Sequence, residues 1–397
     1  MAANRGHSSL CQQKMKKGGL YIHIPFCTEK CIYCDFYSLP DQEHNIEKFV
    51  NSLCSEIKIK AKQKNIDWLI DTIFIGGGTP SLLKEQELEK IISTLNKNFD
   101  LGLLREFTIE ANPGEFNYHK MKSFKSMGVN RISFGFQSLN IKLLKFMSRW
   151  HTPEDSISSY EKARKAGYEN INIDMIFGIP GQTNKVWEND LKVIADMQPE
   201  HISAYSLTIE EQTPLYHLVN SNRIKMPSEN IDLKMFNHTI DFLKQNQYNQ
   251  YEISNYSKNE KECLHNLHYW NREPYISFGP SAHGFDKNVR YWNTKDLKTY
   301  IESLSKNKLP ESESEYLNQE DIFNEIILNS LRINSGIDIN QIKQTFNKNT
   351  QAKILNVAKD WGEHLIIENN SIKLSRKGMP IADEITLDLA NSFIQDL

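Results

Sequence analysis

The sequence is poor in cysteine, in net charge and in long apolar runs. Only six of its 397 residues are cysteine, too few for a disulfide scaffold. The net charge of −3 gives no sign of a nucleic-acid or anionic-membrane partner. No apolar stretch approaches the roughly 20 residues that cross a bilayer. Residues 1–17 are polar, so we expect a disordered tail rather than a secretory signal, and a soluble, cytoplasmic chain.

Half of the cysteines stand together. Cys27, Cys31 and Cys34 stand at spacings of four and three positions and directly follow the apolar, strand-like segment 20–26. Iron–sulfur clusters are usually held by four thiolates. Three close thiolates therefore suggest a [4Fe–4S] cluster with one iron left open for a ligand from outside the protein.

A structural zinc site is the main alternative for closely spaced cysteines. Zinc takes four ligands, commonly as two pairs, and the remaining Cys11, Cys54 and Cys263 are isolated from one another. His23 could be a fourth ligand, although on a strand its side chain can point away from the cysteines. We therefore favour the cluster.

Short apolar runs alternate with longer amphipathic ones in the first half of the chain. This alternation predicts an α/β fold, with a parallel sheet covered by helices. Six units are fewer than the eight of a closed TIM barrel, whose active site lies at the carboxyl ends of its strands. The predicted strands are 20–25, 72–75, 106–110, 131–134, 171–176 and 201–207. The predicted helices are 45–63, 85–98, 118–127, 140–147, 153–166 and 185–197.

Two motifs follow predicted strands. Three consecutive glycines, 76–78, precede Thr79 after the second strand, where a bare backbone can approach a ligand and its amides can bind a carboxylate. Glu110 ends the third strand, where an unpaired charge would be costly. We expect Glu110 to accept hydrogen bonds from a ligand. The structural alternative is a salt bridge to Arg131 or Arg149.

The cysteine loop at the first strand and the glycine turn at the second together resemble the radical S-adenosylmethionine (SAM) superfamily. The resemblance implies a partial (β/α)6 barrel. It also implies that Cys27, Cys31 and Cys34 hold the cluster, whose open iron takes the amino and carboxylate groups of SAM, and that Tyr33 lies near the adenine. The other positions that it places around SAM are Tyr21, Gly77, Gly78, Thr79, Glu110, Gln137, Arg149 and Asp174.

Longer motifs narrow the resemblance to the coproporphyrinogen oxidase-like branch of this superfamily. They lie at 22–27, 76–80, 181–183 and 200–211, together with the Glu110 motif. The oxygen-independent coproporphyrinogen III oxidases of the branch carry a fourth cysteine two residues after the third. Here that position is Phe36, and a phenyl ring cannot replace a thiol.

The resemblance therefore implies a heme chaperone of this branch that lacks coproporphyrinogen III oxidase activity. The oxidase, which decarboxylates porphyrinogen propionates with a SAM-derived radical, is the alternative because the SAM motifs are intact. A third reading is a binding protein in which cluster and SAM are vestigial. The fold alone does not decide among the three.

Residues 265–270 read HNLHYW and resemble the HNxxYW element associated with heme in the chaperones. Histidine is a common axial ligand of heme iron, and aromatic rings can stack on a porphyrin. We expect His265 to be the ligand, with His268 and Cys263 as rivals; without the resemblance, core packing would be favoured. In a later motif, His283 lines the open side of the barrel or merely caps a turn.

The C-terminal segment has the pattern of a winged helix. Helical patterns at 321–332, 338–346 and 352–361 precede a strand pair at 365–368 and 371–374. Residues 316–397 hold eight Lys or Arg and eleven Asp or Glu, a net charge of −3 that argues against nucleic-acid binding. We expect a packing domain that forms a lid over the barrel opening.

Five parts are predicted from these patterns, together with three cofactors and two kinds of protein partner. The parts are a tail (1–17), the barrel (18–225), a barrel extension with the HNxxYW element (226–308), an acidic linker (309–315) and the winged-helix-like domain (316–397). The implied cofactors are a [4Fe–4S] cluster, SAM and heme. The implied partners are recipient hemoproteins and an electron donor such as a ferredoxin or flavodoxin. Transient membrane docking, covalent heme attachment and SAM cleavage stay open.

Overall fold

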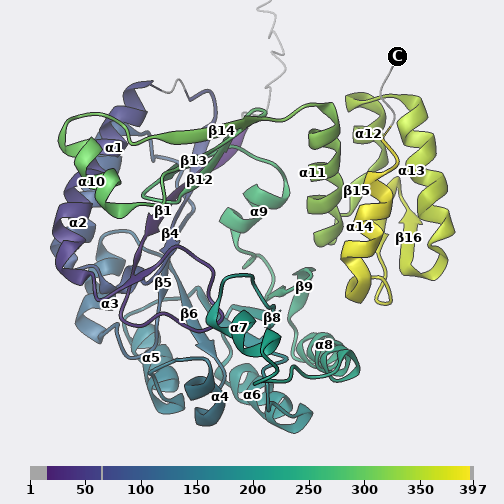
Figure 1. Ribbon diagram of the computed structural model, residues 1–397, viewed down its shortest axis with the longest axis horizontal. Helices are drawn as coiled ribbons and strands as arrows, with labels where there is room; N and C mark the ends of the chain where they lie inside the picture. The colour runs from purple at the N-terminus through teal and green to yellow at the C-terminus, as the bar shows by residue number, and fades with distance from the viewer. Residues whose placement is uncertain (1–15, 64–65, 394–397) are drawn as a thin grey trace, which may run out of the picture.

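The computed structural model describes residues 16–63 and 66–393, and a twelve-stranded sheet forms the centre of this described part (Figure 1). The sheet has the order β14-β13-β12-β11-β1-β4-β5-β6-β7-β8-β10-β9. Six consecutive strands are parallel and confirm the six predicted ones. They are β1 (Lys17–Ile24), β4 (Leu69–Gly77), β5 (Glu106–Ala111), β6 (Arg131–Gln137), β7 (Ile171–Phe177) and β8 (His201–Ser206).

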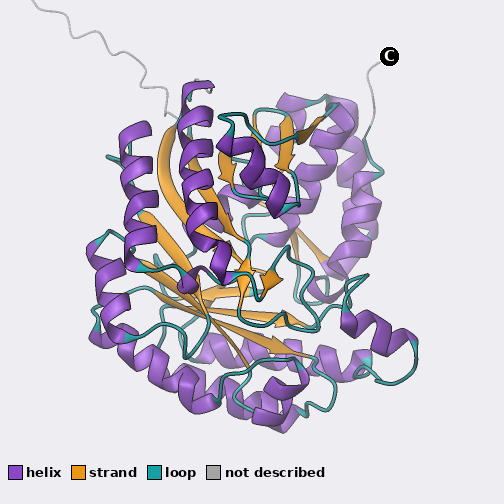
Figure 2. Cartoon of the chain, turned by 60° about the vertical axis from the view of Figure 1, so that its left-hand side comes forward, coloured by secondary structure: helices purple, strands orange, loops and turns teal. Residues whose placement is uncertain are grey.

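Helices cover the outer face of these strands, as Figure 2 shows, and confirm the predicted partial (β/α)6 barrel. Their starts follow local chemistry: α5 begins with Pro153 after a reciprocal capping pair, Thr152 and Asp155. The helices are α1 (Ile46–Gln63), α2 (Glu85–Asn98), α3 (Tyr118–Ser126), α4 (Ile141–Phe146), α5 (Pro153–Lys165) and α6 (Asn184–Met197).

The barrel extension adds strands to both edges of this sheet. β11 pairs with β1 in parallel, so a seventh parallel strand joins the six that were predicted. β10 closes the other side by pairing antiparallel with β8. Helix α7 (Pro214–Asn220) ends the barrel segment, and the elements of the extension are α8 (Glu229–Gln245), β9 (Asn249–Glu252), β10 (Asn255–Ser257), α9 (Leu264–Trp270), β11 (Tyr275–Phe278), β12 (His283–Asp286), β13 (Val289–Asn293) and α10 (Leu297–Ser305).

The predicted linker at 309–315 is wrong for most of its length. Strand β14 (Ser312–Tyr316) lies there and pairs antiparallel with β13, from Asn293 opposite Ser312 to Val289 opposite Tyr316. All five of its side chains are exposed, and its charged residues suit the edge of a sheet, where they discourage pairing with another chain. The predicted tail lies outside the described residues as far as residue 15, and Lys17 already belongs to β1.

The last part of the chain forms a second layer beside the barrel (Figure 1). Its order of helices and strands, with the small sheet β15-β17-β16, is that of the predicted winged helix. Asn369 and Asn370, both with positive φ, turn the hairpin at the predicted place. The elements are α11 (Gln319–Arg332), β15 (Ile337–Asp338), α12 (Ile339–Thr345), α13 (Lys348–Asp360), β16 (Leu365–Glu368), β17 (Ser371–Leu374) and α14 (Ala382–Ala390).

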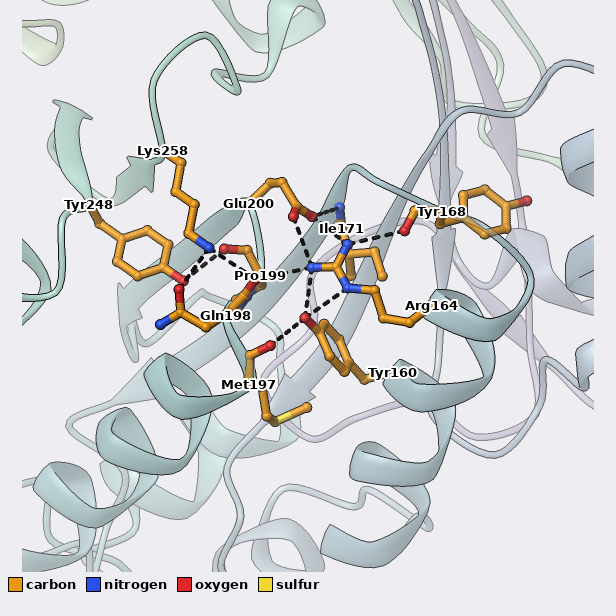
Figure 3. Close-up of polar contacts among 10 residues, drawn as sticks. All are labelled: Tyr160, Arg164, Tyr168, Ile171, Met197, Gln198, Pro199, Glu200, Tyr248 and Lys258. Atoms are coloured by element: carbon orange, nitrogen blue, oxygen red, sulfur yellow. Dashed lines mark hydrogen bonds and ion pairs between the residues drawn. The ribbon is translucent and has the colours of Figure 1, made fainter.

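A hydrogen-bonded network fixes the barrel at the amino ends of β7 and β8 (Figure 3). The Arg164 guanidinium forms an ion pair with Glu200 at 2.8 Å and donates to the Tyr160 hydroxyl at 2.7 Å. Glu200 also accepts the backbone N–H of Ile171 at 3.1 Å. Glu200 is part of the 200–211 motif, so this portion of the motif is structural.

No helix in the described ranges is both long and apolar enough to cross a membrane.

Candidate functional site

The three clustered cysteines lie on one loop at the carboxyl end of β1. Two short strands close this loop, because β2 (Phe26–Cys27) pairs with β3 (Leu39–Pro40). Inside it, the backbone N–H of Cys34 donates to the carbonyl of Cys31 at 3.2 Å. All three cysteines are free thiols, with Cys31 buried and the other two partly exposed. The loop therefore presents three reduced sulfurs from eight consecutive residues.

Two polar side chains reach the sulfurs, one from the segment between α4 and α5 and one from the turn after β4. Arg149 Nη1 donates to Cys31 Sγ at 3.4 Å, and Thr79 Oγ1 donates to Cys27 Sγ at 3.5 Å. Burial, with repulsion from the two neighbouring cysteines, raises the pKa of Cys34 to about 11. Thiols in such surroundings ionise when a metal cation binds them.

The donor set fits an iron–sulfur cluster, since thiolates bind the iron and hydrogen bonds to sulfur tune the cluster. Among the described residues, no group of three or more His, Cys, Asp or Glu side chains stands in closed metal-ligand geometry.

The glycine turn lies directly against the cysteine loop. Pairing of β1 with β4 sets Ile24 opposite Gly77, and the next amides, of Gly78 and Thr79, donate to the carbonyls of Ile24 and Phe26 at 2.8 and 2.6 Å. A Cβ on Gly78 would lie 2.4 Å from the Phe26 carbonyl oxygen, so only glycine permits this approach. The turn and the first cysteine are therefore held together by backbone bonds.

Glu110 faces this turn from the end of β5. Its Oε2 accepts the N–H of Gly77 at 3.0 Å. Burial, and then the charge of Asp174, raise the pKa of Glu110 to about 8. Asp174 is held on β7 by hydrogen bonds from Ser133 and Asn172 at 3.0 and 2.8 Å. A ligand that donates a hydrogen bond to Glu110, or that carries a positive charge beside it, would lower the pKa of this carboxyl group.

The remaining residues predicted to surround SAM come from strands and loops of the barrel. Arg149 Nη2 donates to Asn112 and to the Gly135 carbonyl, while its buried Nε has no partner in the described part of the chain. Gln137, the last residue of β6, has a positive φ of 65°, an unusual conformation for a residue with a side chain. Tyr33 packs on a buried apolar group that includes Leu143 and Leu144, and the Tyr21 hydroxyl bonds His23 Nδ1 at 3.1 Å.

The HNxxYW element forms α9, and its first histidine is fully buried. His265 Nδ1 bonds the Thr72 hydroxyl at 2.7 Å and Nε2 bonds the Tyr269 hydroxyl at 2.9 Å. Its ring also packs on Phe74, with the centroids 5.3 Å apart. The residue expected to bind heme iron thus has both nitrogens occupied.

The two rival ligands of the element are also engaged. Burial would lower the pKa of His268, but hydrogen bonds with Asp71 and Glu273 raise it to about 9, and these bonds occupy both ring nitrogens. The buried Cys263 thiol contacts Glu106 at 3.5 Å, and burial raises its pKa to about 12. No predicted heme ligand therefore has an open coordinating atom in this conformation.

A cavity of about 610 Å³ lies between the cysteine loop, α9 and α11. Tyr269 and Trp270 of the element line it, as do Phe36 and His283. Partial burial, with the charges of Lys295 and Arg290, lowers the pKa of His283. Arg272 and Arg290 also line this cavity, and the sequence analysis did not single them out. Both donate to Glu325, which is far away along the chain, so no local pattern marks them as neighbours.

Comparison with known proteins agrees with this geometry. Residues 21–194 match the radical SAM superfamily. The curated heme chaperone HemW of Bacillus subtilis (strain 168) is 34% identical over 369 residues, 92% of this chain and 97% of the relative. HemW of Buchnera aphidicola subsp. Schizaphis graminum is 39% identical over 277 residues, 68% of this chain and 71% of the relative.

The chain belongs to the HemW family. Among solved structures, coproporphyrinogen III oxidase (HemN) from Escherichia coli has the same fold, with a TM-score of 0.81 and 22% identity over 96% of this chain and 91% of that one. For a HemW-family chain of the radical SAM superfamily, a [4Fe–4S] cluster and SAM are implied, and the family name suggests heme as a ligand.

Proposed function

We propose that this chain is a heme chaperone that binds a [4Fe–4S] cluster and SAM and delivers heme to hemoproteins. The observation that carries the proposal is its similarity to a curated heme chaperone over nearly the full length of both chains. Phe36, 63% exposed beside the cysteine loop, adds to it, since the oxidases of the branch carry a fourth thiol there.

Cys27, Cys31 and Cys34 would hold three irons of the cluster, leaving the fourth to SAM. Three thiolates outweigh the 2+ charge of an oxidised [4Fe–4S] core and leave the site at about −1. The buried guanidinium of Arg149 lies against Cys31 and offsets that charge. Its position supports a role in making the cluster easier to reduce.

The glycine turn and the polar strand ends would hold SAM. The side-chain-free backbone of the turn suits close approach by the methionine end of SAM, and Glu110 suits a donor such as an amino or ribose group. When bound and reduced, the cluster supplies an electron that can cleave SAM. The residues that would surround SAM are Tyr21, Tyr33, Gly77, Gly78, Thr79, Glu110, Gln137, Arg149 and Asp174.

The partners follow from the same proposal. Heme is the cargo, apo-hemoproteins are the recipients, and a ferredoxin or flavodoxin is the class of electron donor. Because the proposed ligand thiols must stay reduced, we propose that the protein acts in the cytoplasm.

A heme-transfer assay tests this function. The protein is reconstituted anaerobically with iron and sulfide, loaded with one equivalent of heme, separated from free heme and mixed with apomyoglobin. The heme-chaperone function predicts that the absorbance of holomyoglobin appears. The same preparation, given SAM, reductant and coproporphyrinogen III, should release no carbon dioxide.

The oxidase is the outcome that would contradict the proposal. Decarboxylation of coproporphyrinogen III without heme transfer would assign the chain to porphyrin synthesis despite Phe36. Cys31→Ala, which removes one proposed cluster ligand, serves as the control in both assays.

A further inference from the structure

The cavity beside the cysteine loop has the size and lining of a site for a flat aromatic ligand. Its volume of about 610 Å³ lies within the roughly 300–1,000 Å³ typical of small-molecule sites. Aromatic side chains line it from more than one element, with Phe36 and Tyr37 on the cysteine loop and Trp270 on α9. Such rings offer stacking surface to a planar macrocycle.

The same cavity carries an excess of positive charge. Asp35 is the one acidic side chain among the described residues that line it, against Lys30, Arg272, Arg290 and Lys295. The two arginines are partly neutralised by Glu325, which accepts from their Nε atoms at 2.8 and 2.5 Å. Nη2 of Arg272 is buried and has no hydrogen-bond partner within the described ranges. The cavity therefore presents positive charge that suits carboxylates, with one unpartnered donor buried at its wall.

One imidazole in the cavity has nitrogens that no other group uses. The ring of His283 stacks on Trp292 with the centroids 5.6 Å apart, and neither of its nitrogens hydrogen-bonds any residue that the structure describes. The other lining histidine, His23, bonds the Tyr21 hydroxyl and the Tyr37 carbonyl at 3.1 and 2.8 Å. His283 is thus the lining histidine that can accept a metal without breaking an existing bond.

We propose that heme binds in this cavity with His283 as the axial ligand of its iron, and that Lys295 and the two arginines bind its propionates. This inference rests on the proposed heme-chaperone function and names the site where the cargo is held. Phe36 then has a positive role, since its exposed ring would face the porphyrin. Tyr269 and Trp270 of the HNxxYW element would form one wall of the heme site. His265 would hold this wall in place through its hydrogen bond with the Tyr269 hydroxyl.

Ligation by His265 would require a larger change. Both of its hydrogen bonds would have to break, and α9 would have to leave β1 and β4, since a Cβ on Gly19 would already lie 2.6 Å from the His265 ring. Leaving the buried Thr72 and Tyr269 hydroxyls without partners is itself unfavourable.

Heme titration of matched histidine variants tests the ligand. Wild type, His283→Ala, His265→Ala and His119→Ala are reconstituted anaerobically, titrated with heme and followed in the Soret band. His119 is an exposed histidine on α3 that does not line the cavity and serves as the matched control.

We expect His283→Ala to shift the Soret band and weaken heme binding by at least about tenfold, because even outer-shell changes weaken metal sites by about 10–100-fold. Added imidazole should restore the wild-type spectrum by replacing the missing ligand. His119→Ala should match wild type.

The alternatives give different results. Wild-type ligation in His283→Ala, or loss of ligation only in His265→Ala with an unchanged circular dichroism spectrum, would overturn the inference while leaving the chaperone function intact. If wild-type protein binds no heme, both the inference and the proposed function fail.

A second titration tests the propionate contacts. Lys295→Gln should weaken binding of heme several-fold and leave binding of heme dimethyl ester unchanged, because the diester has no propionate charge. An equal loss for both ligands, or no loss for either, would contradict the assigned orientation.

Discussion

Strand β5 carries a glutamate at each end, and the two carboxylates have different surroundings. Glu106, at the amino end, is buried and accepts the backbone N–H groups of Leu264 and His265 at 2.9 and 3.1 Å, so it caps the first turn of α9. Glu110, at the carboxyl end, accepts one N–H, from Gly77, and faces Asp174. Glu106 is satisfied by the protein, whereas Glu110 is not.

The same contrast holds for the two ends of the barrel. At the amino ends of β7 and β8, Arg164, Glu200 and Tyr160 satisfy one another (Figure 3). At the carboxyl ends stand three free thiols, and Arg149 with an unpartnered Nε in the described part of the chain. Polar groups paired with each other stabilise the fold, while polar groups left open are available to ligands. The contrast predicts that changes at the two ends separate stability from binding.

The largest effect is expected at the cysteine loop. Cys31→Ala should abolish assembly of a four-iron cluster, because two thiolates and SAM do not complete the ligand set. Iron and sulfide analysis after anaerobic reconstitution measures this. Cys54→Ala, at a buried cysteine on α1, should keep the wild-type iron content. Equal iron content in the two variants would contradict the assignment of the cluster to the cysteine loop.

The next effect is on stability at the amino end. Arg164→Met removes the partly buried ion pair with Glu200 and several hydrogen bonds, and should lower the free energy of unfolding by about 2 kcal/mol. Urea unfolding measures it, with Arg105→Met, at an exposed arginine, as the control. Iron content and SAM affinity should not change; loss of either would show that the network also supports the site.

A smaller effect separates the two glutamates of β5. Glu110→Gln should weaken SAM binding by about tenfold, as expected when a hydrogen bond to a charged group is lost. Glu106→Gln should keep SAM affinity and instead lower the free energy of unfolding by about 1–2 kcal/mol. Calorimetric SAM titration and urea unfolding of both variants test this, and the reverse pattern would contradict it.

The last prediction concerns the pH dependence of stability. Because the folded-state pKa of Glu110, about 8, lies above its unfolded value, the folded protein binds more protons than the unfolded chain between these values. Without SAM, wild type should therefore lose stability relative to Glu110→Gln as pH rises from about 4.5 to 8, by less than about 1.4 kcal/mol per unit. Parallel stability curves for the two proteins would show that Glu110 is not perturbed.

The sequence predicted the barrel well and its edges poorly. The six strands are apolar runs bounded by turn residues. Helix α2 has the predicted limits, because it begins with an acidic first turn and its helical pattern stops at Phe99. The exposed strand β14 needs no apolar residues, so its acidic sequence looked like a linker. β11 is four residues long and pairs with β1, more than 250 residues earlier, which no local pattern indicates.

The candidate site divides in the same way. Cysteine and glycine motifs are contiguous in sequence, so their meeting at the strand ends could be predicted. The environment of His265 depends on Thr72 and Phe74, which lie nearly two hundred residues away along the chain. The burial of His265 could therefore not be predicted from the sequence. Likewise, Arg272 and Arg290 line one cavity and share Glu325 as a partner, which no local pattern indicates.

Electron paramagnetic resonance of the reduced, reconstituted protein with and without SAM tests the central claim most directly. If the carboxyl end holds a cluster with one open iron, SAM should change the g values of the [4Fe–4S]+ signal in wild type and in Arg164→Met alike. It should change them less at equal SAM concentration in Glu110→Gln. A signal that SAM leaves unchanged in wild type would show that no iron is open to it, and would contradict the account.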